Sequence, residues 1–175
     1  MKLLTNIQQF DVSMFTWVMA RKRRALFTQI SRWISHSGDG VLYVAYGAYL
    51  AWTELAADRL LLVCALVAFA VERPLYFVLK NGFKRHRPQD ALNDFRSFII
   101  PSDKFSFPSG HTSAAFVMAT LLSSFHPALT LPAYIWAGLV GLSRIFLGVH
   151  FPTDILVGAA MGTSIALWSL WIFAA

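Results

Sequence analysis

The stretch that decides the fold is residues 105–143, which reads FSFPSGHTSAAFVMATLLSSFHPALTLPAYIWAGLVGLS. It contains no Asp, Glu, Lys or Arg, and residues 155–175 contain none either. A helix needs about 20 mostly apolar residues to cross a bilayer, so runs of this length predict membrane-spanning helices. Only 14% of the 175 residues are charged, whereas a soluble domain carries about 25%. The sequence therefore predicts a polytopic membrane protein.

The apolar segments on either side of this stretch divide the chain into about five predicted spans. Their approximate bounds are 41–55, 60–79, 109–125, 132–147 and 152–173. All of them must be helical, because lipid offers no hydrogen-bond partners to an open strand edge. We therefore expect a single all-α domain, a membrane helix bundle over residues 1–175, with a polar loop at 81–107.

Residues 1–36 contain no predicted span. Apolar and aromatic residues at helical spacing lie on both sides of the basic cluster Arg21-Lys22-Arg23-Arg24. This pattern is typical of helices that lie in the membrane interface, and a cytosolic tail is the alternative. The net charge of +6 gathers at the predicted membrane edges. Anionic lipid headgroups or a phosphorylated substrate are therefore the expected partners, and nucleic acid is not.

Three polar motifs stand at the ends of the predicted spans. They are KNGFKRHRP at 80–88, PSGH at 108–111 and SRIFLGVHFPTD at 143–154. The second span leaves the membrane on the side from which the third enters, and the fourth returns there before the fifth departs. All three motifs are therefore predicted to lie at one membrane face.

The first function that these motifs suggest is phosphate binding. Lys80, Arg87 and Arg144 supply three cations, and guanidinium groups bind phosphate oxygens through paired N–H donors. Ser109 and Gly110 open a predicted helix, where free backbone N–H groups and the helix dipole favour an anion.

The second function is nucleophilic and acid catalysis. His111 and His150 can divide the roles of acid and nucleophile between them. Asp154 lies four residues beyond His150, so one helical turn can hold its carboxylate against a ring nitrogen and leave the other nitrogen free to attack. The set contains no carboxylate cluster suited to magnesium. We expect no metal and no other cofactor.

Together the motifs resemble the type 2 phosphatidic acid phosphatase superfamily, which also contains bacterial acid phosphatases and vanadium haloperoxidases. The resemblance covers residues 80–154. It implies that His150 attacks phosphorus to form a phosphohistidine, that Asp154 orients His150, and that His111 protonates the leaving oxygen. It also implies that water hydrolyses the phosphoenzyme without a metal. The residues implied to hold the phosphate oxygens are Lys80, Arg87, Ser109, Gly110 and Arg144.

The substrate is read less directly, because the motifs contact phosphate and not the lipid tail. The length and layout are similar to those of small bacterial undecaprenyl-diphosphate phosphatases, so undecaprenyl diphosphate in the cell (inner) membrane is the expected substrate. A phosphatidic acid or phosphatidylglycerophosphate phosphatase is the alternative. A vanadium haloperoxidase-like enzyme and a non-catalytic lipid-binding protein are more distant ones. The oligomeric state is left open.

Charge and resemblance indicate opposite sides of the membrane for the active site. The cluster at 21–24 favours the cytoplasm, because positive residues concentrate in cytoplasmic segments. Similar lipid phosphatases mostly work on the outer face. We expect the site to face outward, because a lipid recycled outside the cell needs its phosphate removed there.

Some other polar residues are harder to assign. Glu72 and Arg73 lie inside the second predicted span, where they can serve the site or form a structural ion pair. Asp39 is predicted to be a turn or cap residue. The loop at 89–107 can guide a lipid tail or pack against the N-terminal helices. Three histidines are predicted to be non-catalytic, namely His36, His86 and His126.

Overall fold

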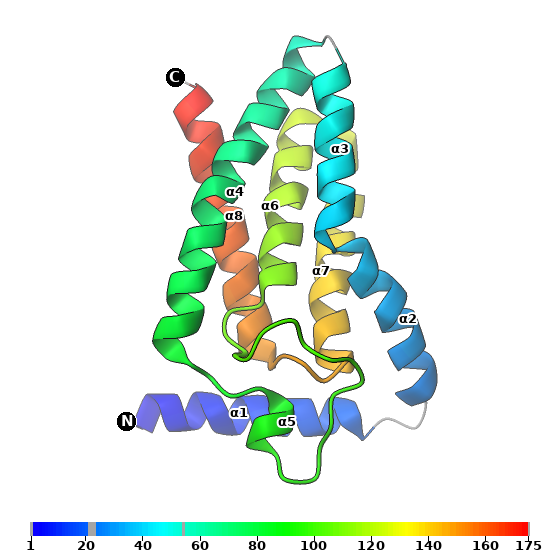
Figure 1. Cartoon of the computed structure of the whole chain (residues 1–175), viewed down its shortest axis with the longest axis vertical. Coiled ribbons are helices and arrows are strands. Elements are labelled where there is room, and N and C mark those ends of the chain that lie inside the picture. The colour runs from blue at the N-terminus through cyan, green and yellow to red at the C-terminus, as the bar shows by residue number, and fades with distance from the viewer. Residues whose placement is uncertain (1, 21–23, 54, 175) are drawn as a thin grey trace.

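The computed structural model describes residues 2–20, 24–53 and 55–174, and within these ranges the chain forms helices and no strand. Five helices run side by side as a bundle (Figure 1). They are α3 (Gly40–Trp52), α4 (Ala56–Phe83), α6 (Gly110–Phe125), α7 (Thr130–Phe146) and α8 (Pro152–Ala174). The predicted all-α membrane bundle is confirmed, and the helix bounds lie within a few residues of those expected.

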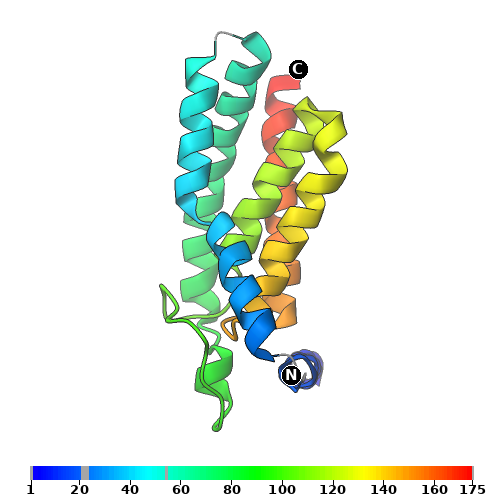
Figure 2. The same cartoon turned by 90° about the vertical axis from the view of Figure 1, so that its right-hand side faces the viewer.

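The N-terminal helices lie at one end of this bundle. Helix α1 (Lys2–Met19) crosses the base roughly at right angles to the bundle axis, as an interfacial helix would (Figures 1 and 2). Helix α2 (Arg24–Ser37) instead rises obliquely against α7 and leads into α3. Residues 21–23 of the basic cluster lie outside the described residues. The short helices α5 (Pro88–Ala91) and η1 (Pro127–Leu129) occupy the connections.

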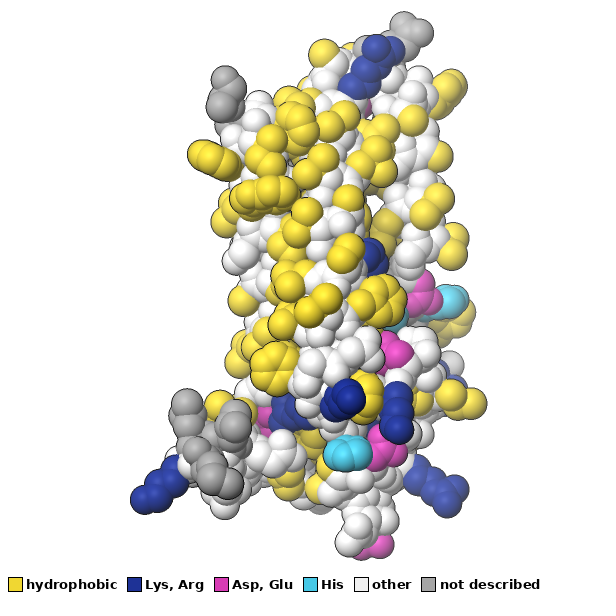
Figure 3. Space-filling view, turned by 60° about the vertical axis from the view of Figure 1, so that its left-hand side comes forward, with side chains coloured by type: hydrophobic (Ala, Val, Ile, Leu, Met, Phe, Trp, Pro, Cys, Tyr) yellow, Lys and Arg dark blue, Asp and Glu magenta, His cyan; other side chains and the backbone are white. Residues whose placement is uncertain are grey.

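Three segments of the described chain are long and apolar enough to cross a membrane by themselves: Ala56–Ala91, Pro127–Phe146 and Pro152–Phe173. Helix α3 has only 13 residues and α6 only 16, fewer than the roughly 20 that a spanning helix needs. Helix α6 packs against α4, α7 and α8, so protein replaces lipid around much of it. Hydrophobic side chains cover the helix shafts in Figure 3, whereas most charged ones gather at the lower end.

The contact between α6 and α8 is close enough to exclude side chains. A Cβ atom on Gly162 would lie 2.2 Å from the backbone oxygen of Ser113. Small residues allow helix backbones to approach one another in membranes, where close packing drives association. The same approach brings the start of α6 to the start of α8, and the Ser109 N–H donates a hydrogen bond of 3.1 Å to the carbonyl of Asp154. Packing in the bundle therefore joins the second motif to the third.

We predict that Gly162→Ala lowers the thermal unfolding midpoint of the purified protein in detergent. The added methyl group must push two helix backbones apart, and overpacking of this kind costs about 1–3 kcal/mol. The matched control is Gly138→Ala in α7, where a Cβ atom would meet nothing within 4 Å. That substitution should be neutral or stabilising by up to about 1 kcal/mol, since alanine favours helix more than glycine does. Equal midpoints for the two variants would contradict the prediction.

Candidate active site

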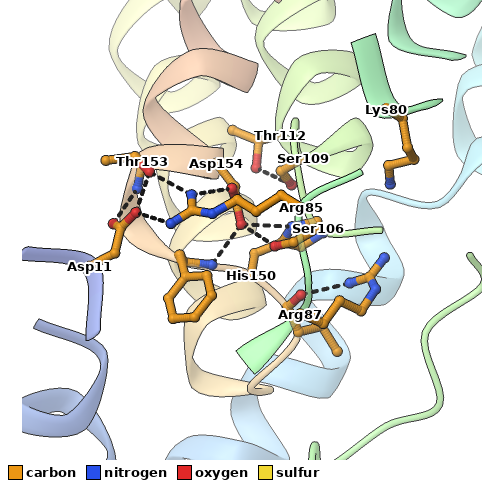
Figure 4. A network of polar contacts seen from close by, with 12 residues as sticks. Asp11, Lys80, Arg85, Arg87, Ser106, Ser109, Thr112, His150, Thr153 and Asp154 are labelled. Atoms are coloured by element: carbon orange, nitrogen blue, oxygen red, sulfur yellow. Dashed lines mark hydrogen bonds and ion pairs between the residues drawn. The ribbon is translucent and has the colours of Figure 1, made fainter. Parts of the chain in front are cut away.

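The three motifs meet at the end of the bundle that carries α1 (Figures 1 and 4). Lys80 lies in the last turn of α4, Arg144 in the last turn of α7, and Asp154 in the first turn of α8. Ser109 occupies the residue position just before α6, and Arg87 immediately precedes α5. Helix ends position most of these residues because the bundle reverses direction between them.

His150 and Asp154 are both buried, with 2% and 0% of their surface exposed. His150 lies on the turn between α7 and α8, and Gly148 makes that turn with a φ of 76°, which residues other than glycine rarely adopt. The Nδ1 atom of His150 is 3.5 Å from Asp154 Oδ2. This separation is longer than an ordinary hydrogen bond, but it directs Nδ1 at the carboxylate. The other ring nitrogen, Nε2, is left for chemistry.

The protonation state of His150 suits a nucleophile. Burial lowers the pKa of His150 to about 3, although the neighbouring Asp154 carboxylate opposes this shift. The positive charges of Arg87 and Arg144 act in the same direction as burial. The ring is therefore neutral at neutral pH and carries the lone pair that nucleophilic attack requires.

Lys80 and Arg87 converge on a carboxylate that the sequence did not single out, that of Asp103. Lys80 Nζ lies 2.7 Å from Asp103 Oδ1, and Arg87 Nη2 lies 2.5 Å from the same oxygen. The hydroxyl of Tyr76 donates to the other oxygen. Burial would raise the pKa of Asp103, but hydrogen bonds from Lys80 and Tyr76 outweigh it and lower the pKa to about 2. An ionised carboxylate thus sits where two predicted phosphate ligands meet.

Arg144 and His111 lie beside this group and contact the N-terminal part of the chain. Arg144 Nη1 donates to the hydroxyl of Ser35, and its buried Nε atom has no hydrogen-bond partner among the described residues. A buried donor without a partner indicates a place for a ligand oxygen. His111 Nε2 lies 2.9 Å from Asp39 Oδ1. Asp39 precedes α3 as a cap residue, as predicted, but its side chain makes no cap bond and turns to the histidine.

Ser109 and Gly110 lie at the predicted start of the helix, but only Gly110 lines the site. Gly110 faces the cavity described below, whereas Ser109 is buried and its Oγ accepts a hydrogen bond of 2.9 Å from the Thr112 hydroxyl. No side chain caps α6, so backbone N–H groups of its first turn remain available to an anion. Binding of phosphate by these two residues stays a prediction.

Asp154 is held by more partners than its histidine (Figure 4). Arg85 Nη1 donates to Oδ1 at 2.8 Å, and the Ser106 hydroxyl donates to Oδ2. The backbone N–H of Phe151 donates to Oδ2 at 2.8 Å. Together with His150, these three donors surround the buried carboxylate and fix its plane.

A cavity of about 880 Å³ opens between α3, α4 and α6 and reaches the predicted catalytic residues His111 and His150. Its inner end is lined by Arg87, Asp103, His111, Arg144 and His150. Its outer part is apolar, and the residues there include Val44, Leu50, Leu62, Leu66, Phe69 and Met118. A pocket that is polar at one end and apolar at the other fits a molecule with a phosphate head and a hydrocarbon tail.

Glu72 and Arg73 form a structural ion pair at the edge of this cavity. Arg73 Nη2 lies 2.6 Å from Glu72 Oε1, and Glu72 is fully buried. The Arg73 guanidinium also lines the cavity and lies 4.9 Å from the centre of the Tyr76 ring. The structural ion pair is thus observed, and a role of the pair in the chemistry of the site stays a prediction.

Sequence reasoning missed Asp103, Arg85, Asp11 and Tyr76. For each of them, no residue at a short and regular spacing in the sequence indicates the partner that it contacts in the structure. The only available signal was that Arg85 falls inside the first motif, between Lys80 and Arg87. Among the described residues no group of three His, Cys, Asp or Glu side chains could hold a metal ion.

Comparison with known proteins places this geometry in a family. The model of the PAP2 superfamily matches residues 59–175. Phosphatidylglycerophosphatase B of Bacillus subtilis (strain 168) is 36% identical over 155 residues, which cover 80% of this chain and 72% of that protein. The bacitracin transport permease protein BcrC of Bacillus licheniformis is 32% identical over 130 residues, which cover 74% of this chain. That match spans 64% of BcrC, less than two thirds of its length.

A solved structure agrees with the sequence matches. The crystal structure of LpxE from Aquifex aeolicus superposes with a TM-score of 0.80 at 29% identity, over 92% of this chain and 94% of that one. The family model covers well over half of the chain, and it includes all three motifs and the helices that position them. The chain therefore belongs to the PAP2 superfamily.

Proposed function

We propose that this chain is a membrane lipid phosphatase that hydrolyses a phosphate or diphosphate group from a lipid, with undecaprenyl diphosphate as the expected substrate. The observation that carries the proposal is the cavity, which joins His150, His111 and Arg144 to an apolar groove between α3 and α4. Membership of the PAP2 superfamily and the phosphatidylglycerophosphatase among its relatives support the same class of hydrolase.

In the proposed reaction His150 is the nucleophile. Its Nε2 atom bonds to phosphorus as the bond from phosphorus to the leaving oxygen breaks, and His111 gives that oxygen a proton. Asp154 stabilises the ring, which becomes positively charged as it attacks. Water then attacks the phosphohistidine, which releases inorganic phosphate and restores the free imidazole.

Charge that develops on the phosphoryl oxygens is met by groups already in place. Arg87, Arg144 and Gly110 line the inner end of the cavity, Lys80 reaches it through Asp103, and Ser109 precedes the first turn of α6. Preorganised donors of this kind supply much of the stabilisation of a transition state. The Asp103 carboxylate occupies part of this position in the free protein, and we infer that it stands in for the phosphate, which must displace it.

Phosphatidylglycerophosphate is the second candidate substrate, favoured by the 36% identity to phosphatidylglycerophosphatase B, and phosphatidic acid belongs with it. The undecaprenyl assignment rests on the similarity in length and layout noted above. A haloperoxidase-like role fits the lipid-facing groove poorly. A purely lipid-binding role leaves the buried pair of His150 and Asp154 without a purpose.

The site is proposed to face outward from the cell membrane. The end of the bundle that carries α1 and the motifs lies opposite the C-terminal end of α8 (Figure 1). A lipid released on the outer face requires a phosphatase whose active site faces outward. The basic cluster at 21–24 instead favours an active site that faces the cytoplasm.

We predict that His150→Ala abolishes phosphate release by the purified protein and leaves it folded. Loss of a covalent nucleophile costs on the order of 10⁶ in kcat in a well-studied hydrolase. Asp154→Asn should lower kcat by about 10⁴, because the ring loses its orienting carboxylate. The control is His126→Ala, at the opposite end of the bundle, which should retain activity. Near-normal turnover by His150→Ala would refute the mechanism.

We predict that Asp103→Asn tightens inhibition by vanadate, which adopts the five-coordinate geometry of phosphoryl transfer. Removal of the competing negative charge should lower the inhibition constant by on the order of tenfold, equivalent to about 1.4 kcal/mol. Asp94→Asn, which changes an exposed carboxylate of the same loop, should leave the constant unchanged. An unchanged or weaker affinity in Asp103→Asn would show that Asp103 does not stand in for phosphate.

We predict that the wild-type protein, in detergent with excess chelator, releases inorganic phosphate fastest from undecaprenyl diphosphate. The panel should also contain phosphatidylglycerophosphate and phosphatidic acid, at matched surface concentration and with kcat/KM as the measurement. A preference for a glycerophospholipid would replace the leading substrate with the second candidate. Activity that requires added magnesium would contradict the metal-free mechanism.

A further inference from the structure

Arg85 makes more polar contacts with the catalytic residues than its place in the sequence suggests. Its Nη1 atom donates to Asp154 Oδ1 and to the Thr153 hydroxyl, both at 2.8 Å. Its backbone carbonyl accepts a hydrogen bond of 2.8 Å from the N–H of Ser106, whose hydroxyl donates to Asp154 Oδ2. Arg85 therefore holds the Asp154 carboxylate in two ways. Its guanidinium donates to the carboxylate directly, and its backbone carbonyl holds Ser106, which is a second donor. None of its contacts is with the cations that the mechanism assigns to phosphate.

The other side of the Arg85 guanidinium is held by helix α1. Nη2 donates to Asp11 Oδ2 at 2.5 Å (Figure 4), and it also donates to Gln8 Oε1 at 2.8 Å. Asp11 also accepts from Thr153, from its backbone N–H at 3.0 Å and from its hydroxyl. One guanidinium thus lies between Asp11 on α1 and Asp154 on α8.

The two carboxylates that contact Arg85 are buried, so each of them needs a positively charged partner. Asp11 and Asp154 are each 0% exposed, and the Arg85 side chain is 17% exposed. An isolated buried carboxylate is strongly unfavourable, so each acid depends on the shared cation. A planar guanidinium offers separate N–H groups to the two carboxylates in a rigid fork, whereas the ammonium group of lysine is a compact charge on a flexible chain without that fixed geometry.

The outer side of helix α1 is apolar. Four large apolar residues are exposed there, at Ile7, Phe10, Met14 and Trp17. A helix that lies across the base of a membrane bundle with such a face is suited to the lipid interface. Asp11 and Phe15 point the other way and are buried against the bundle. The same helix therefore presents an apolar face on one side and contacts the Asp154 network on the other.

We propose that Arg85 and Asp11 are positioning residues for the nucleophile, and that α1 supplies Asp11 as part of the active site. Arg85 fixes Oδ1 of Asp154, which turns Oδ2 toward His150 Nδ1, and Asp11 fixes Arg85. Turnover then depends on α1 being docked against the bundle. This inference rests on the proposed function, because it concerns the same histidine nucleophile.

The test compares full-length Asp11→Asn, Arg85→Lys and the double variant with wild type, using whichever panel lipid the wild type hydrolyses. We expect kcat to fall by about 10² to 10³ in each single variant, and KM and the vanadate inhibition constant to stay within about threefold. The double variant should lose little more than either single variant, because both act through one connection to Asp154. Gln9→Ala, which changes an exposed residue of α1, should behave as wild type.

Folding is measured separately, by the thermal unfolding midpoint and by size-exclusion profile in detergent. If Asp11→Asn does not fold, Arg85→Lys retains the positive charge and tests the same connection. A folded Asp11→Asn or Arg85→Lys with kcat within twofold of wild type would overturn the inference, as would independent, multiplying losses in the double variant. Inactivity of the wild type on every lipid would instead overturn the proposed function.

Discussion

The buried carboxylate of Asp154 is the group on which the arrangement of the site depends. It accepts hydrogen bonds from Arg85, from Ser106 and from the backbone N–H of Phe151, and its own carbonyl accepts one from Ser109. The end of α4, the loop before α6 and the starts of α6 and α8 are therefore joined at one residue. A charge buried this deeply is tolerated only with many donors, and the helix ends that supply them are held together as a result.

The ion pairs of this site form two groups, which differ in how deeply their carboxylates are buried. Arg85 lies between Asp11 and Asp154, which are both fully buried, so this group is part of the framework. Lys80 and Arg87 share Asp103, which is partly exposed on a loop. Arg144 retains a buried Nε atom without a partner among the described residues. In the proposed mechanism, the buried pairing orients the nucleophile, and the more exposed pairing is the one that phosphate displaces.

The bundle contains both a closely packed frame and an apolar cavity. Close approach of α6 and α8 at Gly162 fixes the distance between the second and third motifs. On the opposite side of α6, the cavity beside α3 and α4 is lined by apolar side chains over much of its length. A lipid can then place its tail among hydrophobic residues while its phosphate reaches groups at the membrane edge. Chemistry at the end of the helices avoids burying the charged substrate in hydrocarbon.

The sequence by itself determined the helices and the motif residues. Lipid excludes unpaired charges and backbone groups, so the uncharged runs at 105–143 and 155–175 predicted the helices that the structure shows as α6, α7 and α8. The cost of burying polar groups in lipid likewise predicted that His150 and Asp154 lie near a membrane edge. One helical turn between those two residues also predicted their approach. These features depend on local spacing and on composition, which a single sequence displays directly.

Only the tertiary structure decided the partners that hold the site. Asp11 meets Thr153 across 142 residues, and Arg87 meets Asp103 across 16. Such contacts leave no periodic pattern, because they depend on how α1 crosses the base of the bundle and how the loop before α6 folds back. The oblique path of α2, which brings Ser35 to Arg144, is likewise set by packing against α7. Charge pairing through space is a property of the assembled helices, and for that reason the sequence named the candidate reacting groups but not the residues that hold them in place.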